Sequence, residues 1–489
     1  MASFYIYDIG FLIIFSLFVG IFLYKRRHNL KREGIMYLYR TRVGIKFINY
    51  VGTKYKRTLT VFGFIGVITG YFLMVVMLYF LYKLVYIYLF APDIVRAIKI
   101  PPLMPLIPYL PAAFKISFLP PFYFTYWIIS IAVIAIFHEF AHGIIARRYN
   151  VRIHTTGFGF LGPFLAAFVE PDEKEMQEKS KYQQLAILSA GVFTNLILAV
   201  IFFLLLSVFF VAAYAPAGYI FNDYAVQIVE VSMITMIGGK FVDDASNQGI
   251  LRLIKENNLT DDFVLGSNGN NLNLIKITAN GNTYYMTVDN LKIQLEQDFP
   301  HVILYGDFPA INAGLKGAII KINDNDIKGI NDLTKIMEGY NPGDEIKIVT
   351  KTTDNKILEY DIVLGEDPNQ EGRAIIGTRT REISGRLLGK IFNFFNFFKE
   401  PGTNYEPRFN ADFVVFIYNL IWWLALINLS VAMVNMWPVA IFDGGRFFML
   451  SVWAITGSEK FAMASFKFMT YLILGSLLLL MFGWFVAVF

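Results

Sequence analysis

Six stretches of this chain are apolar for long enough to cross a lipid bilayer as helices. They run over residues 9–24, 59–90, 122–145, 185–214, 413–436 and 461–488. A spanning helix needs about 20 predominantly apolar residues, and the shortest stretch reaches that length with its flanks. Hydrophobic residues make up 56% of the 489 residues and charged residues only 17%, which excludes an ordinary soluble globule. We therefore expect a polytopic α-helical membrane protein with about six transmembrane helices.

The distribution of basic residues predicts the orientation of these helices. The net charge is only +5, but residues 25–58 hold eleven Lys or Arg and a single acid, Glu33. Loops rich in Lys and Arg stay on the cytoplasmic side, so this segment is expected there and the N-terminus outside. Because it adjoins two spans, the segment is expected to contact lipid headgroups, and nucleic acid is not expected as a partner. The chain has no cysteine, so no disulfide can form and no thiolate can bind a metal.

The third apolar stretch ends in the sequence FHEFAHG, residues 137–143. Residues four apart lie on one face of a helix, so His138 and His142 can bind one metal ion. Glu139 lies beside them and can act as general base on a metal-bound water. Ionisable groups in a membrane helix are costly, so a functional interpretation is favoured over a structural one. We expect a hydrolytic metal site near the cytoplasmic end of this helix, which is followed by two arginines.

Two features next to this helix are expected to complete the site. Residues 151–170 are apolar but broken by three glycines and a proline, which is typical of non-helical backbone at membrane depth beside a cavity. A re-entrant β-hairpin beside the active site is expected, with an interfacial loop as the alternative. In the fourth span, Asn195 needs a hydrogen-bond partner, and the helix with the two histidines is the nearest candidate. A purely structural interhelical hydrogen bond is the alternative.

The composition changes between residues 215 and 408, where Gly, Asn, Asp and Lys become frequent and β-like runs appear. Four preceding spans place this β-rich insert outside the cytoplasm. Its end, residues 383–399, is rich in Phe and is expected to lie as an amphipathic helix on the membrane surface or on the insert itself.

Three motifs together resemble those of the site-2 protease family of intramembrane zinc metalloproteases, peptidase family M50. The first is HEFAH at 138–142. The second is NMWPVAIFDGG at 435–445, which resembles the family pattern N-x-x-P-x(4)-D-G. The third is the stretch from Gly191 to Asn195, which resembles G-x-x-x-N, with Val192 where a proline is usual. The resemblance covers the membrane core, about 122–215 and 411–489, and the first two spans are additions that a minimal family core does not need.

The resemblance implies a third metal ligand, Asp443, beside His138 and His142. A catalytic zinc takes three protein ligands and keeps one position open. His154 and Glu170, in the expected hairpin, are the competing ligands. The resemblance also implies Zn²⁺ as cofactor and membrane-spanning proteins as substrates. Asn195 or Asn435 is expected to hold the substrate backbone or the oxyanion.

Part of the insert resembles a PDZ domain. Residues 307–323 resemble the turn and strand of protease-associated PDZ modules, and the PDZ-like module is placed at about 296–366. PDZ domains bind extended peptides at a sheet edge. Residues 216–300 are β-rich too, and either belong to the same module or form a second one.

These observations divide the chain into five expected parts. They are 1–121 with two helices and the basic loop, 122–215 with the first part of the core, 216–382 with the extracytoplasmic domain, 383–410 with the amphipathic segment, and 411–489 with the rest of the core. The expected function is intramembrane zinc proteolysis of membrane-anchored proteins in a multi-pass cell-membrane protein. The alternatives are a catalytically silent scaffold that binds peptides and a transporter, although the spans lack the inverted repeat of many transporters.

Overall fold

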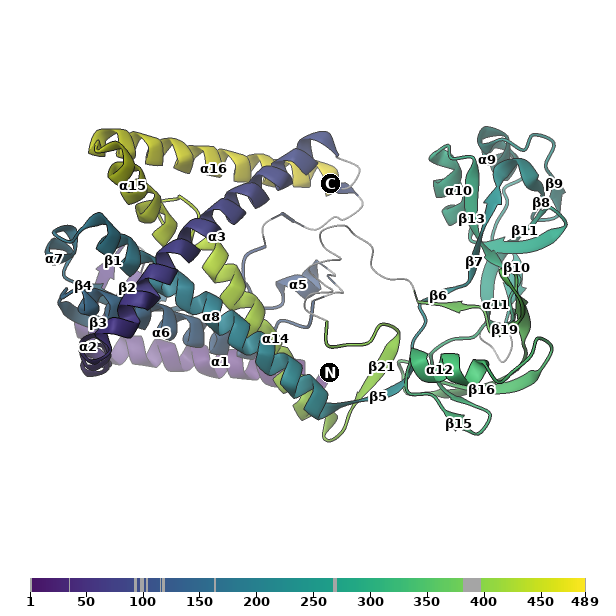
Figure 1. The fold of residues 1–489 in the computed structure, drawn as a ribbon, viewed down its shortest axis with the longest axis horizontal. Helices are drawn as coiled ribbons and strands as arrows, with labels where there is room; N and C mark the ends of the chain where they lie inside the picture. The colour runs from purple at the N-terminus through teal and green to yellow at the C-terminus, as the bar shows by residue number, and fades with distance from the viewer. Residues whose placement is uncertain are drawn as a thin grey trace. The chain divides into compact units, whose positions relative to one another are not determined.

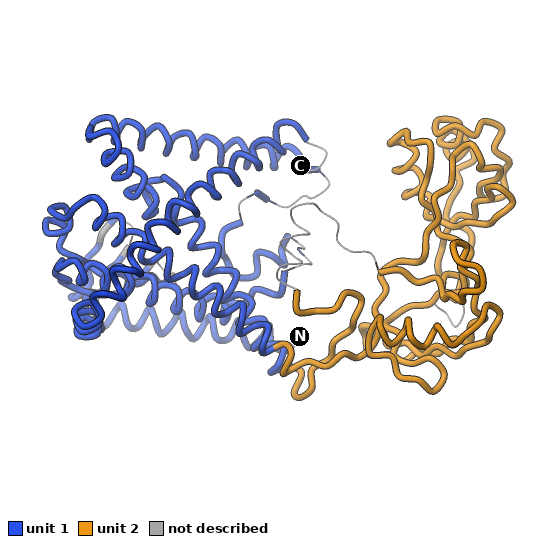
Figure 2. The backbone as a smooth tube through the Cα atoms, in the orientation of Figure 1, with its two compact units in different colours: residues 1–209, 412–489 blue, residues 210–411 orange. Residues whose placement is uncertain are grey.

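The computed structural model describes residues 2–34, 36–91, 95–96, 101–102, 104–114, 116, 119–161, 164–266, 271–380 and 397–488 (Figure 1). The chain forms two compact units (Figure 2). Unit 1 comprises residues 1–209 and 412–489, and unit 2 comprises residues 210–411. Residues 383–396 of the expected amphipathic segment lie outside the described residues.

Unit 1 contains the long apolar helices that the sequence predicts. They are α1 (Ala2–Lys25), α3 (Lys56–Phe90), α6 (Phe124–Arg148), α8 (Lys181–Ala213), α14 (Ala411–Val434) and α16 (Glu459–Val488). Within the described residues, these six helices are long and apolar enough to cross a membrane. At about 1.5 Å per residue, even the shortest of them exceeds the roughly 30 Å of a hydrocarbon core. The polytopic helical fold is thus confirmed.

Shorter helices connect and brace these spans. They are α2 (Ile45–Lys54), α5 (Leu110–Ala113), α7 (Glu173–Gln177) and α15 (Asp443–Thr456), with a 3₁₀ turn at Arg27–Asn29. The α2 helix packs against α6, where a Cβ on Gly143 would lie 3.2 Å from Cδ1 of the fully buried Ile48. The α7 helix is capped by Asp172, whose carboxylate accepts a hydrogen bond from Glu175 N at 3.0 Å.

A four-stranded antiparallel sheet joins two distant parts of unit 1. Its order is β1 (Leu30–Glu33), β2 (Met36–Thr41), β3 (Ile153–Leu161) and β4 (Phe164–Pro171). Strands β3 and β4 form an antiparallel pair where the re-entrant hairpin is expected. Strands β1 and β2, which come from the basic segment, extend this pair to four strands and were not expected. A Cβ at Gly157 would lie 2.3 Å from the Tyr39 carbonyl oxygen. Strand β2 can therefore pair with β3 at this distance only because position 157 has no side chain.

The α6 helix is anchored at its first turn by a carboxylate from α1. Asp8 is 1% exposed and accepts hydrogen bonds from Phe124 N at 2.8 Å, from Thr125 N at 2.9 Å, and from the Tyr109 hydroxyl. The first amides of a helix have no intrahelical acceptor, and a negative charge there also interacts favourably with the helix dipole. Asp8 therefore connects α1 to the end of α6 that lies farthest from the two histidines.

Asp8→Ala is expected to destabilise unit 1 by about 2–4 kcal/mol, since the three donors around this buried carboxylate lose their acceptor together. Thermal unfolding of the detergent-solubilised protein measures this as a lowered Tm. The matched control is Asp412→Ala, which removes an exposed acid from the first turn of α14. Equal Tm values for the two variants would contradict the anchoring role.

Unit 2 contains two larger sheets. The first has the order β7 (Val226–Glu230), β13 (His301–Gly306), β12 (Asn282–Met286), β11 (Leu272–Ala279), β8 (Ile234–Ile237) and β9 (Lys240–Phe241), with β10 (Phe263–Leu265) also paired to β11. The second has the order β17 (Ile357–Val363), β16 (Glu345–Lys351), β14 (Ala318–Ile322), β5 (Tyr214–Tyr219) and β21 (Thr403–Pro407), with β15 (Asn325–Asp326) also paired to β14.

Short elements complete unit 2. Its helices are α9 (Asn247–Glu256), α10 (Val288–Glu296), α11 (Pro309–Asn312) and α12 (Ile330–Met337), with a 3₁₀ turn at Val231–Met233. Two small ribbons pair β18 (Gly365–Asp367) with β19 (Gln370–Ile375), and β20 (Thr378–Arg379) with β6 (Asp223–Tyr224).

The two larger sheets share one pairing scheme. In the first sheet, β8 pairs with both β9 and β11, and β11 pairs with β12. Helix α9 follows the β8–β9 pair in the chain and precedes the β11–β12 pair. In the second sheet, β14 pairs with both β15 and β16, and β16 pairs with β17. Helix α12 follows the β14–β15 pair in the chain and precedes the β16–β17 pair. Each sheet buries its own apolar core. Residues 226–306 thus form a sheet separate from the one that contains the PDZ-like sequence.

Candidate metal centre

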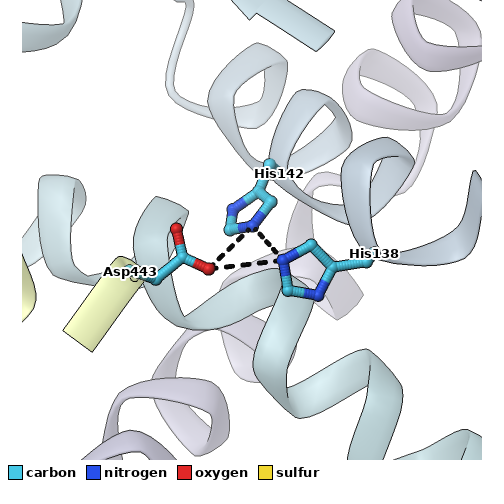
Figure 3. Close-up of side chains that lie close together, drawn as sticks. All are labelled: His138, His142 and Asp443. Atoms are coloured by element: carbon cyan, nitrogen blue, oxygen red, sulfur yellow. Dashed lines mark hydrogen bonds and ion pairs between the residues drawn. The ribbon is translucent and has the colours of Figure 1, made fainter. Parts of the chain in front are cut away.

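Three side chains from two helices converge in unit 1 (Figure 3). His138 and His142 lie one turn apart on α6, and Asp443 is the first residue of α15. The Nε2 atoms of the two histidines are 3.0 Å apart. Asp443 Oδ2 lies 3.3 Å from His138 Nε2 and 3.4 Å from His142 Nε2. The three potential ligand atoms therefore form a nearly equilateral triangle.

The size of this triangle fits a zinc ion. Zinc binds histidine nitrogen and carboxylate oxygen at about 2.0–2.1 Å in tetrahedral sites, which separates neighbouring ligand atoms by about 3.3–3.4 Å. The three measured separations of 3.0, 3.3 and 3.4 Å are close to that value. Two histidines and one carboxylate leave a fourth position open, as a catalytic zinc site requires.

A tight turn between α14 and α15 positions Asp443. Gly444 N donates a hydrogen bond to the Asn435 carbonyl oxygen at 2.7 Å. A Cβ on Gly444 would lie 2.4 Å from the carbonyl carbon of Met436, so a larger residue would open the turn. Asn435, predicted to contact substrate, thus contributes its backbone to the position of the third ligand.

The α8 helix lies directly against both histidine rings. A Cβ on Gly191 would be 2.4 Å from His142 Nε2 and 2.6 Å from His138 Nε2, so only glycine allows this approach. The Ile187 carbonyl oxygen lies 2.7 Å from His142 Nδ1. The side-chain nitrogen of Asn195, Nδ2, lies 3.0 Å from His138 Nδ1. The hydrogen bond expected between Asn195 and the histidine helix is therefore present.

Glu139 lies beside the triangle without belonging to it. Its Oε2 accepts a hydrogen bond from Val169 N of β4 at 3.1 Å. Glu139, His142 and Asp443 line one cavity of about 650 Å³, together with residues of β4 and with Arg446. The carboxylate is thus within the cavity that also contains two of the three potential ligands.

The two competing ligands have other partners. Glu170 interacts with Arg40, whose Nε lies 3.1 Å from its Oε2, and accepts a hydrogen bond from the Thr155 hydroxyl at 2.6 Å. The Arg40 guanidinium, and secondly the Thr155 hydroxyl, hold the pKa of Glu170 below its ordinary value. His154 Nε2 lies 3.1 Å from Asp172 Oδ2. Both residues line the cavity but lie outside the triangle.

A family model described as Peptidase family M50 matches residues 126–480, which is well over half of the chain. The chain belongs to this family. A search of the curated proteins finds no match. The M50 match includes His138, His142 and Asp443, and it implies an intramembrane metalloprotease of the site-2 protease family. Residues before 126, with α1, α2, α3 and the strands β1 and β2, lie outside the M50 match.

Two backbone groups of this candidate site were missed by sequence reasoning. They are the Ile187 carbonyl, which faces His142, and the Val169 amide, which binds Glu139. Every residue has a backbone carbonyl, and every residue except proline has a backbone amide, so no residue type marks these groups. Ile187, Gly191 and Asn195 follow one another at intervals of four residues, and only this spacing could have indicated that the Ile187 carbonyl lies on their helix face.

Proposed function

We propose that this M50 peptidase uses Zn²⁺, bound by His138, His142 and Asp443, to hydrolyse peptide bonds within or near transmembrane segments of membrane-anchored proteins. One observation carries this proposal. Three potential ligand atoms lie 3.0–3.4 Å apart, next to a cavity that Glu139 also lines. A structural zinc site is usually closed by four protein ligands and needs no neighbouring base.

Glu139 acts as general base and then as general acid. When bound, zinc supplies Lewis acidity, which polarises the scissile carbonyl and acidifies water. Glu139 takes a proton from the attacking water as the C–O bond forms. It returns that proton to the leaving nitrogen as the C–N bond breaks, so the carboxylate is regenerated. The hydrogen bond from Val169 N keeps the Glu139 side chain turned toward β4.

A substrate strand is proposed to add to β4. A helical substrate has all its amides in internal hydrogen bonds, so it must unwind before its carbonyl reaches the site. β4 is the last strand of its sheet, and the Val169 amide points from its outer edge toward α6. Alternate residues of a strand share an edge, so the Ala167 backbone lies on the same edge as Val169, where a substrate strand would pair once the Val169 amide leaves Glu139. This supports the proposal that the β3–β4 hairpin is re-entrant and lies at membrane depth.

The remaining roles follow from the sequence patterns. The active site is proposed to face the cytoplasm, because α2 of the basic segment 25–58 packs on α6 and Leu38 and Arg40 of β2 line the same cavity as Glu139. The insert is proposed to lie outside the cytoplasm, where its PDZ-like module binds peptides or excludes untrimmed substrates. Asn435 is proposed to contact the substrate backbone or the oxyanion through its side chain.

The deciding experiment is cleavage of a single-span reporter protein by the detergent-solubilised chain, with and without a chelator, together with the zinc content per chain. We expect cleavage with one zinc bound and none after chelation. A chain that holds one zinc but cleaves nothing, even after removal of residues 216–400, would favour the silent scaffold. Cleavage that appears only after this removal would indicate that the insert gates substrate entry.

A further inference from the structure

The two nitrogens of His138 face different partners. Nε2 points to His142 and Asp443, while Nδ1 lies 3.0 Å from Nδ2 of the Asn195 side chain. Asn195 has no exposed surface and comes from α8, the helix against which both rings pack. A neutral imidazole carries one proton, and the nitrogen that binds a metal must be the unprotonated one. For His138 to bind through Nε2, its proton must be on Nδ1, which then needs an acceptor.

The orientation of the Asn195 amide decides which tautomer it supports. With Nδ2 toward the ring, the amide donates, and Oδ1 is left buried without a hydrogen-bond partner among the described residues. Rotating the amide by half a turn exchanges its oxygen and nitrogen, and the choice between the two orientations rests on the hydrogen bonds they make. In the rotated orientation, Oδ1 accepts the proton of His138 Nδ1 across the same 3.0 Å contact, and Nδ2 takes the buried position that Oδ1 leaves. The need for an unprotonated His138 Nε2 therefore decides between the two orientations.

The second histidine supports this interpretation. His142 Nδ1 lies 2.7 Å from the Ile187 carbonyl oxygen, and a carbonyl can only accept. His142 therefore carries its proton on Nδ1 and presents Nε2 to the triangle. Ile187, Gly191 and Asn195 are four residues apart and share one face of α8. One face of α8 thus supplies the Ile187 carbonyl as acceptor, the space at Gly191 for both rings, and the Asn195 amide next to His138.

We infer that Asn195 is a positioning residue that accepts a hydrogen bond from His138 Nδ1 through Oδ1 and so keeps His138 Nε2 free for the metal. This inference rests on the proposed zinc site. It assigns the G-x-x-x-N stretch a task in metal binding, where the sequence suggested contact with substrate. Hydrogen-bond partners of metal-binding histidines typically contribute about 10–100-fold in metal affinity.

Zinc affinity of the full-length, detergent-solubilised protein tests the inference. The probe is Zn²⁺ alone, titrated against a chromophoric chelator. Asn195→Leu removes the acceptor and is expected to weaken zinc binding about 10–100-fold. Asn195→Asp keeps acceptor oxygens but has no donor, and is expected to bind zinc at least as tightly as the parent protein. The matched control is Asn428→Leu, since Asn428 is equally buried but donates to Leu424 O of its own helix.

Each outcome separates the possible roles. Unchanged zinc affinity in Asn195→Leu, with a raised KM for the reporter, would overturn the inference in favour of substrate binding. Weak zinc binding in Asn195→Asp would overturn it by showing that the amide must donate. Thermal unfolding without zinc checks that each variant is folded, and the visible spectrum of bound Co²⁺ reports whether its coordination is unchanged. Zinc binding that survives His138→Ala would instead reject the proposed zinc site, and the inference with it.

Discussion

Glu139→Gln is expected to bind one zinc per chain with unchanged affinity and to cleave the reporter at least about 10³-fold more slowly than the parent protein. Glutamine has nearly the same size and can still accept the hydrogen bond from Val169 N, which lies 3.1 Å from Oε2. It cannot take a proton from water. Since Glu139 is not among the three potential ligands, zinc binding and catalysis should separate in this variant.

Zinc content and initial cleavage rates, measured on the same preparation, check this result. Glu178→Gln, which changes an exposed carboxylate in the loop before α8, is the control and should cleave normally. Cleavage by Glu139→Gln within a few fold of the parent rate would reject the assignment of Glu139 as the base. Loss of zinc along with activity would show instead that Glu139 contributes to metal binding.

Gly191→Ala is expected to lose zinc and activity together. The added Cβ would lie 2.4 Å from His142 Nε2 and 2.6 Å from His138 Nε2, closer than real Cβ contacts. Both rings would have to shift, and displacements of about 1 Å in such a site commonly reduce rates by about 10²-fold. We expect zinc affinity to fall by at least that factor, because two of the three ligands move.

Gly475→Ala is the control for this substitution. It also changes a glycine of a long apolar helix, but its Cβ would meet no atom within 4 Å. Zinc affinity by chelator competition should be normal in Gly475→Ala and reduced in Gly191→Ala. Tight zinc binding by Gly191→Ala would mean that the rings do not need the close approach of α8.

The parts of this protein that follow short-range rules were predictable from its sequence. The lengths of the apolar stretches predicted the six helices, and the four-residue spacing predicted that His138 and His142 lie on one helix face. The resemblance to the M50 motifs brought in Asp443, which lies about 300 residues away in the chain and could not be placed by spacing alone. The position of Asp443 beside the two histidines depends on the turn between α14 and α15, where the Gly444 amide donates a hydrogen bond to the Asn435 carbonyl.

The secondary structure of the basic segment 25–58 was not predicted from the sequence. Its charges predicted a cytoplasmic loop, yet it contains β1, β2 and α2. The run MYLYRT at 36–41 has the tyrosines typical of strands, but a strand is recognised reliably only when its partner is known. That partner is β3, and Thr41 and Thr156 are 115 residues apart. Local patterns could not indicate a pairing over that distance.

The pairing of β2 with β3 also constrains the order in which the protein can assemble. β2 is synthesised before α3 and α6, but its partner strand follows both of them. Until those two helices are in the membrane, β2 has an unpaired edge, and such edges are prone to pair with other chains. Contacts between segments so far apart also form slowly. The sheet beside the metal centre therefore cannot be completed until α3 and α6 have been synthesised, and a chain begun at the M50 match would lack the strand that pairs with β3.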